Sequence, residues 1–322
     1  MRIAEYFYAD DVTQRRLFKQ VGVDHAVLRL PEADDGSTAV DLHRLARLQQ
    51  EFAADGLTIE VIEPLAPPFE QVKQGLPGRD QQLEQVNHLL RGMGELGIGI
   101  LCYNFMAVHG WMRTRFDLTT RGGALVTGFD RADLPDADAA VRLDDDQLWD
   151  NYRYFLHAVV PVAEEAGVRL ALHPDDTPLS PLRGVARILR TPDALERALS
   201  LSDSPNHGIT FCQGTIATMG ADVPATIRRL GRRTFFVHFR DIAGTAESFV
   251  ETFISEGRTD MWAAMRAWVE VGFEGPVRSD HVPTLHGEPN HRPGYATLGR
   301  LHAIGNIQGL YEAARAEASA HT

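Results

Sequence analysis

The chain of 322 residues contains only two cysteines, Cys102 and Cys212, which are too few for a disulfide framework and predict free thiols. No apolar run approaches the roughly 18 residues of a membrane span, and the first residues lack the basic and apolar regions of a signal peptide. The net charge of −12 argues against nucleic acids and anionic membranes as partners. We therefore expect a cytoplasmic protein that binds neither a nucleic acid nor a membrane.

Several catalytic motifs are also absent. The sequence contains no GxSxG, HExxH, CxxC or P-loop, so nothing supports a serine hydrolase, a zincin or an NTPase. A GxGxxG string does occur at Gly92, Gly94 and Gly97. It ends a predicted helix and precedes a strand, the reverse of the order that places a phosphate at a helix N-terminus, so it is not a dinucleotide site.

Eight short apolar runs alternate with amphipathic segments along the chain. The predicted strands are 2–8, 25–30, 57–63, 98–105, 168–173, 208–213, 234–240 and 276–281. Several helical segments end at a glycine directly before the next strand, as expected of βα units with parallel strands. A doubly wound open sheet alternates in the same way, but the pattern favours a (β/α)₈ TIM barrel, with residues 1–322 as one barrel domain.

One segment, residues 107–146 after the fourth strand, interrupts this alternation. It has no helical period and is rich in glycine and aspartate, and loops of this length are usually functional or disordered. Within it, residues 117–130 alternate around Gly122 and Gly123 as a β-hairpin does. The segment is predicted to form an ordered lid over the barrel mouth, with a floppy surface insertion as the alternative.

Four strands in the second half end on side chains that bind metals: His173, Cys212, His238 and Asp280. Each residue alone could be an ordinary core or salt-bridge residue, but strand ends in a barrel encircle a common point. Together they predict a divalent cation site. Their dispersal over the chain favours a catalytic site, and the single thiolate favours Zn²⁺, Fe²⁺, Mn²⁺ or Co²⁺ over Mg²⁺ and Ca²⁺.

Polar and aromatic residues near these strand ends suit a polyhydroxylated anionic ligand. Arginine matches a carboxylate, and asparagine and histidine match hydroxyl groups. The residues predicted to contact substrate are Asn104, His109, Trp111, Arg113, Asp175 and Arg240. Tyr295, fifteen residues after Asp280, could carry a proton if a cation lowers its pKa. Each of these residues could equally serve in packing.

Several strings are similar, in order and spacing, to those of the mannonate dehydratases of the hexuronate pathway. They are CYNFM, WMRT, ALHPDD, NHGITFCQGT, HFRDI, SFVETFISEGRTDM, SDH, and RPGY with the following GRLHAIGNIQGLYEA. The similarity extends from about Leu57 to the C-terminus. ALHPDD and TFCQGT together are specific, whereas RPGY alone would not be.

The resemblance implies a barrel of the xylose-isomerase-like kind that dehydrates D-mannonate to 2-keto-3-deoxy-D-gluconate with one Mn²⁺ or Fe²⁺. It places the metal ligands on the same four residues, His173, Cys212, His238 and Asp280. Asp280 and Tyr295 would be acid and base residues, with His281 as a further catalytic group. The resemblance also implies a homo-oligomer, a dimer or a higher assembly.

The sequence departs from this family in regions predicted to contact substrate. RIAEYFYADD and LPEADDGSTAV replace aromatic stretches near the start, Gly110 replaces an aspartate, and TPLSPLRG replaces an aromatic stretch after HPDD. A sugar isomerase or epimerase on the same metal barrel is therefore an alternative, because it removes the same kind of proton. A non-catalytic metal-binding or ligand-sensing barrel is a second alternative.

Overall fold

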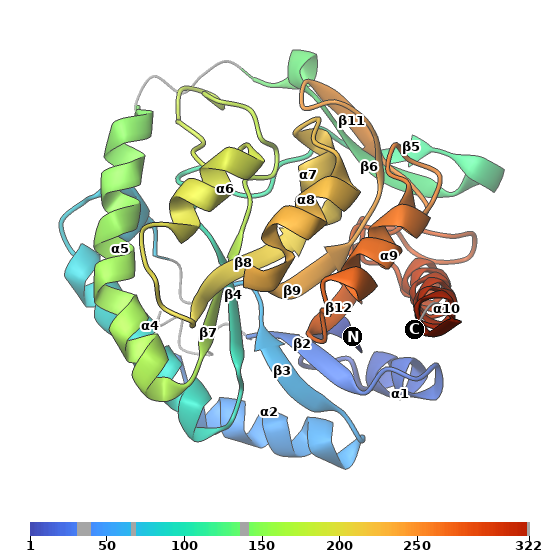
Figure 1. The fold of residues 1–322 in the computed structure, drawn as a ribbon, viewed down its shortest axis with the longest axis horizontal. Coiled ribbons are helices and arrows are strands. Elements are labelled where there is room, and N and C mark those ends of the chain that lie inside the picture. Colours follow the sequence, from blue (N-terminus) through green and yellow to red (C-terminus); the bar gives the residue numbers. More distant parts are fainter. Residues whose placement is uncertain (31–39, 66–68, 136–141, 321–322) are drawn as a thin grey trace.

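The barrel consists of eight parallel strands in a closed ring (Figure 1). The computed structural model describes residues 1–30, 40–65, 69–135 and 142–320. The barrel strands are β1 (Arg2–Tyr8), β2 (His25–Arg29), β3 (Thr58–Ile62), β4 (Ile100–Asn104), β7 (Arg169–His173), β8 (His207–Cys212), β9 (Thr234–Phe239) and β12 (Pro276–Ser279). Their order around the ring is β1-β12-β9-β8-β7-β4-β3-β2, which confirms the predicted (β/α)₈ barrel and excludes the open sheet.

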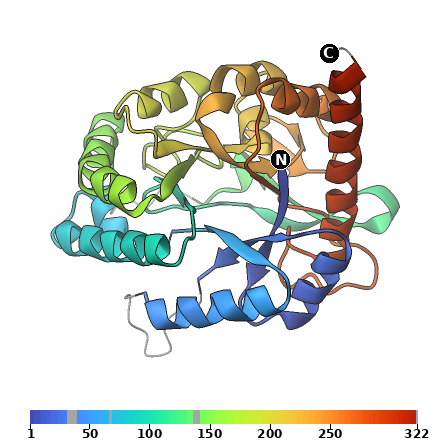
Figure 2. The same ribbon diagram turned by 60° about the horizontal axis from the view of Figure 1, so that its bottom comes forward.

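Helices surround this ring of strands. They are α1 (Val12–Gln20), α2 (Leu42–Ala54), α3 (Glu70–Gln74), α4 (Arg79–Glu95), α5 (Asp145–Ala166), α6 (Pro192–Leu199), α7 (Gln213–Thr218), α8 (Val223–Leu230), α9 (Met261–Glu270) and α10 (Thr297–Ala320). Figure 2 shows α10 as a long column along one side of the barrel. None of the described helices has the length and hydrophobicity needed to cross a membrane.

Local sequence signals explain where the helices begin and end. At the start of several helices, a side-chain oxygen of the N-cap residue accepts a hydrogen bond from a backbone N–H of the first turn. These N-cap residues are Asp11, Asp41, Asp144, Thr191, Asp222 and Asp260. The long helix α5 ends at Gly167, whose φ of 68° is in the left-handed region that favours glycine, and β7 begins two residues later. These caps set the chain direction at the βα junctions.

The core has two layers, as the alternation of strand side chains requires. One side of the strands packs against the helices in a large apolar cluster. The other side fills the barrel interior with Ala4, Tyr6, Val27, Val61, Ile100, Cys102, Ala171, Phe235 and Phe236. The interior is thus closed by side chains, and the strand ends are left to form a site.

A second, antiparallel sheet has the order β10-β11-β6-β5. Its strands are β5 (Arg115–Thr119), β6 (Leu125–Asp130), β10 (Ile242–Gly244) and β11 (Ser248–Glu251). β5 and β6 come from the predicted lid segment, whereas β10 and β11 follow β9 and did not stand out in the sequence. That this sheet acts as a lid stays a prediction. Residues 136–141 of the segment, and residues 31–39 of the altered loop after β2, lie outside the described part of the chain.

Candidate active site

Four neighbouring strands carry the predicted metal ligands. His173 is the last residue of β7, Cys212 is the last residue of β8, His238 lies in β9, and Asp280 directly follows β12. These strands are adjacent in the ring, and Cys212 and His238 are partners in the β8–β9 register. Because parallel strands all end at the same rim, the four side chains converge there.

The donor atoms of His173, Cys212 and His238 lie within 4.8 Å of one another. Asp280 Oδ2 is 3.9 Å from Cys212 Sγ and 3.7 Å from His238 Nδ1. His173 Nδ1 lies 2.6 Å from the carbonyl oxygen of Pro174; because a carbonyl only accepts, Nδ1 carries the proton and Nε2 keeps its lone pair. Neither ring nitrogen of the buried His238 has a well-aligned hydrogen bond. These residues fit a divalent cation with nitrogen, sulfur and oxygen ligands.

A second group, Glu63, Cys102 and His238, is equally compact. Arg278, however, donates from Nε and Nη2 to the two oxygens of Glu63, at 2.9 and 3.0 Å. His238 Nε2 lies 3.0 Å from Glu63 Oε1, at hydrogen-bond length but without linear alignment. Although burial opposes it, the charges of Arg278 and His238 lower the pKa of Glu63 well below its ordinary value. Arg278 binds both oxygens of Glu63 but only Oδ1 of Asp280, so the second group is a poorer cation site.

Arg278 connects the two groups. Its Nη1 donates to Asp280 Oδ1 at 2.8 Å, while its other nitrogens bind Glu63. Glu63 and Arg278 were missed in the sequence, although both carried a signal. Glu63 directly follows β3 as Asp280 follows β12, and Arg278 precedes Asp280 by two residues on the same side of the chain.

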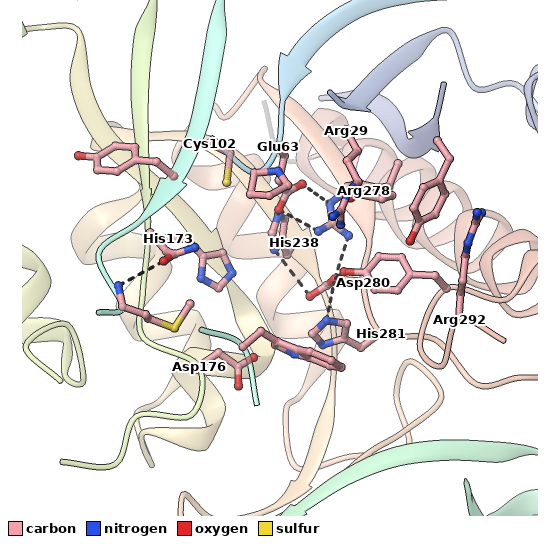
Figure 3. A pocket seen from close by; sticks show the side chains of 18 of the residues that line it. Arg29, Glu63, Cys102, His173, Asp176, His238, Arg278, Asp280, His281 and Arg292 are labelled. Atoms are coloured by element: carbon pink, nitrogen blue, oxygen red, sulfur yellow. Dashed lines mark hydrogen bonds and ion pairs between the residues drawn. The ribbon is translucent and has the colours of Figure 1, made fainter. Parts of the chain in front are cut away.

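A cavity of about 450 Å³ opens beside these ligands. Of the predicted site residues, it is lined by Asn104, Trp111, His173, His238, Asp280, His281 and Tyr295. Figure 3 shows His173 on one side of the pocket and Arg292 on the other, with Asp280 between them. Arg29 and Arg292 also line the cavity and were not singled out in the sequence. The cavity therefore combines three of the four predicted cation ligands, all except Cys212, with arginines that suit an anionic ligand.

Tyr295 and His281 flank one oxygen of Asp280. Tyr295 Oη and His281 Nε2 each lie 3.5 Å from Asp280 Oδ1. Burial, followed by the charge of Asp280, raises the pKa of Tyr295 well above its ordinary value of 10, so its hydroxyl is protonated. Burial also lowers the pKa of His281, against the attraction of Asp280, which favours the neutral imidazole. A protonated phenol and a neutral imidazole are an acid and a base in one pocket.

Four of the predicted substrate contacts do not line the cavity: His109, Arg113, Asp175 and Arg240. Asp175 is buried and accepts the backbone N–H of Leu189 at 2.8 Å. The backbone carbonyl of His109 accepts a hydrogen bond from Arg187 at 2.6 Å. These two residues thus organise the loops around the site.

Arg113 and Arg240 belong to a buried cluster with Asp176 and Glu251. Arg113 reaches Asp176 Oδ1 at 2.8 Å and Glu251 Oε1 at 2.6 Å, and Arg240 reaches the same two residues at 2.7 and 2.8 Å. Two positive and two negative charges balance, and every side chain is at most 2% exposed. Glu251 comes from β11, whereas Asp176 and Arg240 follow the barrel strands β7 and β9, so the cluster attaches the antiparallel sheet to the barrel.

Comparison with known proteins places this geometry in a family. The family model described as D-mannonate dehydratase (UxuA) matches residues 1–143 and 137–321. Mannonate dehydratase 2 of Halalkalibacterium halodurans is 37% identical over 301 residues, which cover 84% of this chain and 86% of that protein. Mannonate dehydratase of Thermotoga petrophila is 33% identical over 343 residues, with 94% of each chain covered.

Solved structures agree with these matches. The crystal structure of mannonate dehydratase from Streptococcus suis serotype 2 superposes with a TM-score of 0.92 at 32% identity, covering 99% of this chain and 95% of that chain. A structure of L-ribulose 3-epimerase superposes with a TM-score of 0.67 at 17% identity, covering 100% and 98%. At that identity the second match concerns the fold alone.

Proposed function

The chain belongs to the mannonate dehydratase family, and from this premise we propose that it removes water from a sugar acid, converting D-mannonate to 2-keto-3-deoxy-D-gluconate. The observation that carries the proposal is the convergence of the His173, Cys212 and His238 donor atoms within 4.8 Å, beside a cavity that His173, His238 and Tyr295 line. Such a cavity has the size of a small-molecule site.

His173, Cys212, His238 and Asp280 would hold one divalent cation, for which we propose Mn²⁺ or Fe²⁺. The thiolate and the two imidazoles suit a transition metal, and the carboxylate oxygen suits either ion. When bound, the cation supplies Lewis-acid chemistry that acidifies the proton next to the substrate carboxylate. Asp280 Oδ2 faces Cys212 and His238, whereas Oδ1 faces Arg278 and Tyr295. One carboxylate thereby connects the cation ligands to the proton-transfer groups.

The proton transfers are assigned to His281 and Tyr295, with Asp280 as the group that positions them. The neutral imidazole of His281 removes the proton from C2 of the substrate, and the phenol of Tyr295 donates its proton to the hydroxyl that leaves C3 as water. The C2–C3 enol formed in this way then tautomerises to the 2-keto-3-deoxy acid. Asp280 Oδ1, 3.5 Å from both groups, keeps them at adjacent positions.

Substrate binding is assigned to the cavity walls. Asn104 and Trp111 line the cavity and would contact the hydroxylated chain. Arg29 and Arg292 replace Arg113 and Arg240 as the proposed contacts for anionic or hydroxyl groups, because the latter two arginines already pair with carboxylates. We further propose that the enzyme serves hexuronate catabolism in the cytoplasm and that it forms a homo-oligomer.

An aldonate panel tests the proposal. The Mn²⁺-loaded protein is incubated with D-mannonate and its epimers, and 2-keto-3-deoxy acids are measured against an EDTA-treated sample. We expect 2-keto-3-deoxy-D-gluconate from D-mannonate in the loaded sample alone. Isomerised or epimerised sugars without loss of water would overturn the dehydratase assignment in favour of an isomerase or epimerase.

A further inference from the structure

Two hydrogen-bond donors converge on the sulfur of Cys212. Thr215 Oγ1 lies 3.2 Å from Cys212 Sγ, and Arg240 Nη1 lies 3.4 Å from it. All three side chains are at most 1% exposed, so water does not compete for these contacts. We propose that Thr215 and Arg240 are positioning residues that donate to the Cys212 thiolate and thereby limit how strongly it donates electrons to a bound cation. This inference rests on the proposed role of Cys212 as a ligand.

Local structure places Thr215 beside the sulfur. Cys212 ends β8 and is the N-cap of α7, and Thr215 follows it by three residues, a spacing that brings side chains to the same face. The Thr215 hydroxyl has a second possible acceptor, Asp176 Oδ2, at 3.5 Å. That distance is long for two oxygens, whereas 3.2 Å is short for an oxygen and a sulfur. The hydroxyl proton therefore points at Cys212.

Arg240 is held in place from several sides. Its Nε and Nη2 donate to the two oxygens of Glu251, both at 2.8 Å, and Nη1 donates to Asp176 at 2.7 Å. Gly214 leaves room for this side chain, since a Cβ there would lie 2.7 Å from Arg240 Cγ, Cδ and Nε. With its guanidinium fixed by two carboxylates, Arg240 presents Nη1 to the sulfur and cannot turn toward a substrate in the cavity.

Hydrogen bonds to a metal thiolate stabilise the sulfur lone pairs and so reduce their donation to the metal. Where a transition metal has a single thiolate ligand, its electronic spectrum is expected to respond to these hydrogen bonds. The arrangement gives Cys212 two donors, and Asp280 Oδ2 lies 3.9 Å from the sulfur and 3.9 Å from Arg240 Nη1.

The test uses Co²⁺ in the full-length protein, because a thiolate bound to Co²⁺ gives an intense charge-transfer band. We expect Thr215→Val, which keeps the shape and removes the hydroxyl, to move this band to longer wavelength. Thr215→Ser, which keeps the hydroxyl, should leave the band at the wild-type position. Thr218→Val is the matched control, because Thr218 is buried in the same helix and donates to the Gly214 carbonyl at 2.7 Å.

The outcomes separate the two proposals. The inference on Thr215 would be overturned if the band of Thr215→Val stays at the wild-type wavelength. It would also be overturned if the band of Thr218→Val moves as far as that of Thr215→Val. If the wild-type protein binds Co²⁺ without any thiolate band, Cys212 is no ligand and the proposed cation site itself is overturned. Thermal unfolding of each variant shows whether it is folded before its spectrum is compared.

Discussion

Tyr295 Oη lies 3.5 Å from Asp280 Oδ1, on the carboxylate oxygen that also accepts from Arg278 at 2.8 Å. The other oxygen, Oδ2, is the one near Cys212 and His238. This division means that one carboxylate can serve a cation and a proton donor at the same time. It also means that the role of Tyr295 can be separated from cation binding by substitution.

Tyr295→Phe is expected to lower kcat by about 10²- to 10⁴-fold, because it removes the acid that protonates the leaving hydroxyl. Cation content should stay at the wild-type level, since the phenol contacts only the Oδ1 side of Asp280. Steady-state kinetics and elemental analysis measure the two effects. Tyr154→Phe, at an exposed tyrosine of α5, is the control. Normal turnover by Tyr295→Phe would remove this residue from the mechanism.

The two cysteines distinguish the two candidate cation groups. Cys212 belongs to the group with His173 and His238, whereas Cys102 belongs to the group with Glu63 and His238. We expect Cys212→Ala to lose the bound cation and the activity, and Cys102→Ala to keep the cation. Both sulfurs are buried in the barrel, so each variant controls for the cavity left by the other. Elemental analysis after dialysis measures the cation content of both variants. If Cys102→Ala loses the cation and Cys212→Ala keeps it, the site is instead the group with Glu63 and Cys102.

The strand ends were predictable because two local signals coincide. Apolar runs of strand length fix where β7, β8, β9 and β12 end, and the residue types at those ends, such as His173 and Cys212, are uncommon there by chance. Convergence then follows from barrel closure alone. For the same reason, Glu63, which directly follows β3, could have been predicted from the sequence as a residue of the site.

The buried cluster was not predictable in this way. The sequence indicated Arg113 and Arg240 as contacts for a substrate carboxylate, because an arginine near a site has that chemistry. Their partners are Asp176 and Glu251, and Glu251 lies in β11, a strand too short to show an alternating pattern. Which of two acidic partners an arginine meets, a substrate or a distant carboxylate, depends on tertiary packing that periodicity does not encode.

Arg113→Met tests whether this arginine is part of a structural cluster. Removing it leaves Asp176 and Glu251 with one guanidinium between them, so we expect the free energy of unfolding to fall by about 3–5 kcal/mol. The control is Arg115→Met, because Arg115 lies two residues away, is exposed and pairs with Asp133. This substitution should change the free energy of unfolding by less than about 1 kcal/mol. Urea unfolding in EDTA measures both. A variant of wild-type stability with only a raised KM would restore Arg113 as a substrate contact.

His207 is expected to make the free energy of unfolding depend on pH. It is fully buried at the start of β8, and Tyr152 Oη lies 3.1 Å from its Nε2. Burial, with a smaller contribution from Arg233, lowers its pKa from 6.5 to about 4. Between these values the unfolded chain binds the proton and the folded protein does not, so acid favours unfolding. This histidine should cost about 2 kcal/mol of stability between pH 7 and pH 5.

Replacing His207 by glutamine removes this titration. Between pH 7 and pH 5, the free energy of unfolding of the variant should therefore decrease less than that of the wild type, by a difference of about 2 kcal/mol. Urea unfolding of the EDTA-treated proteins at pH 7 and pH 5 gives the comparison, and the carboxylates shared by both proteins cancel in the difference. His43→Gln, at an exposed histidine of α2, should follow the wild-type curve. Because only the difference between the two pH values is used, a general destabilisation by the substitution does not affect the result. Equal losses in His207→Gln and the wild type would show that His207 titrates alike in the folded and unfolded states.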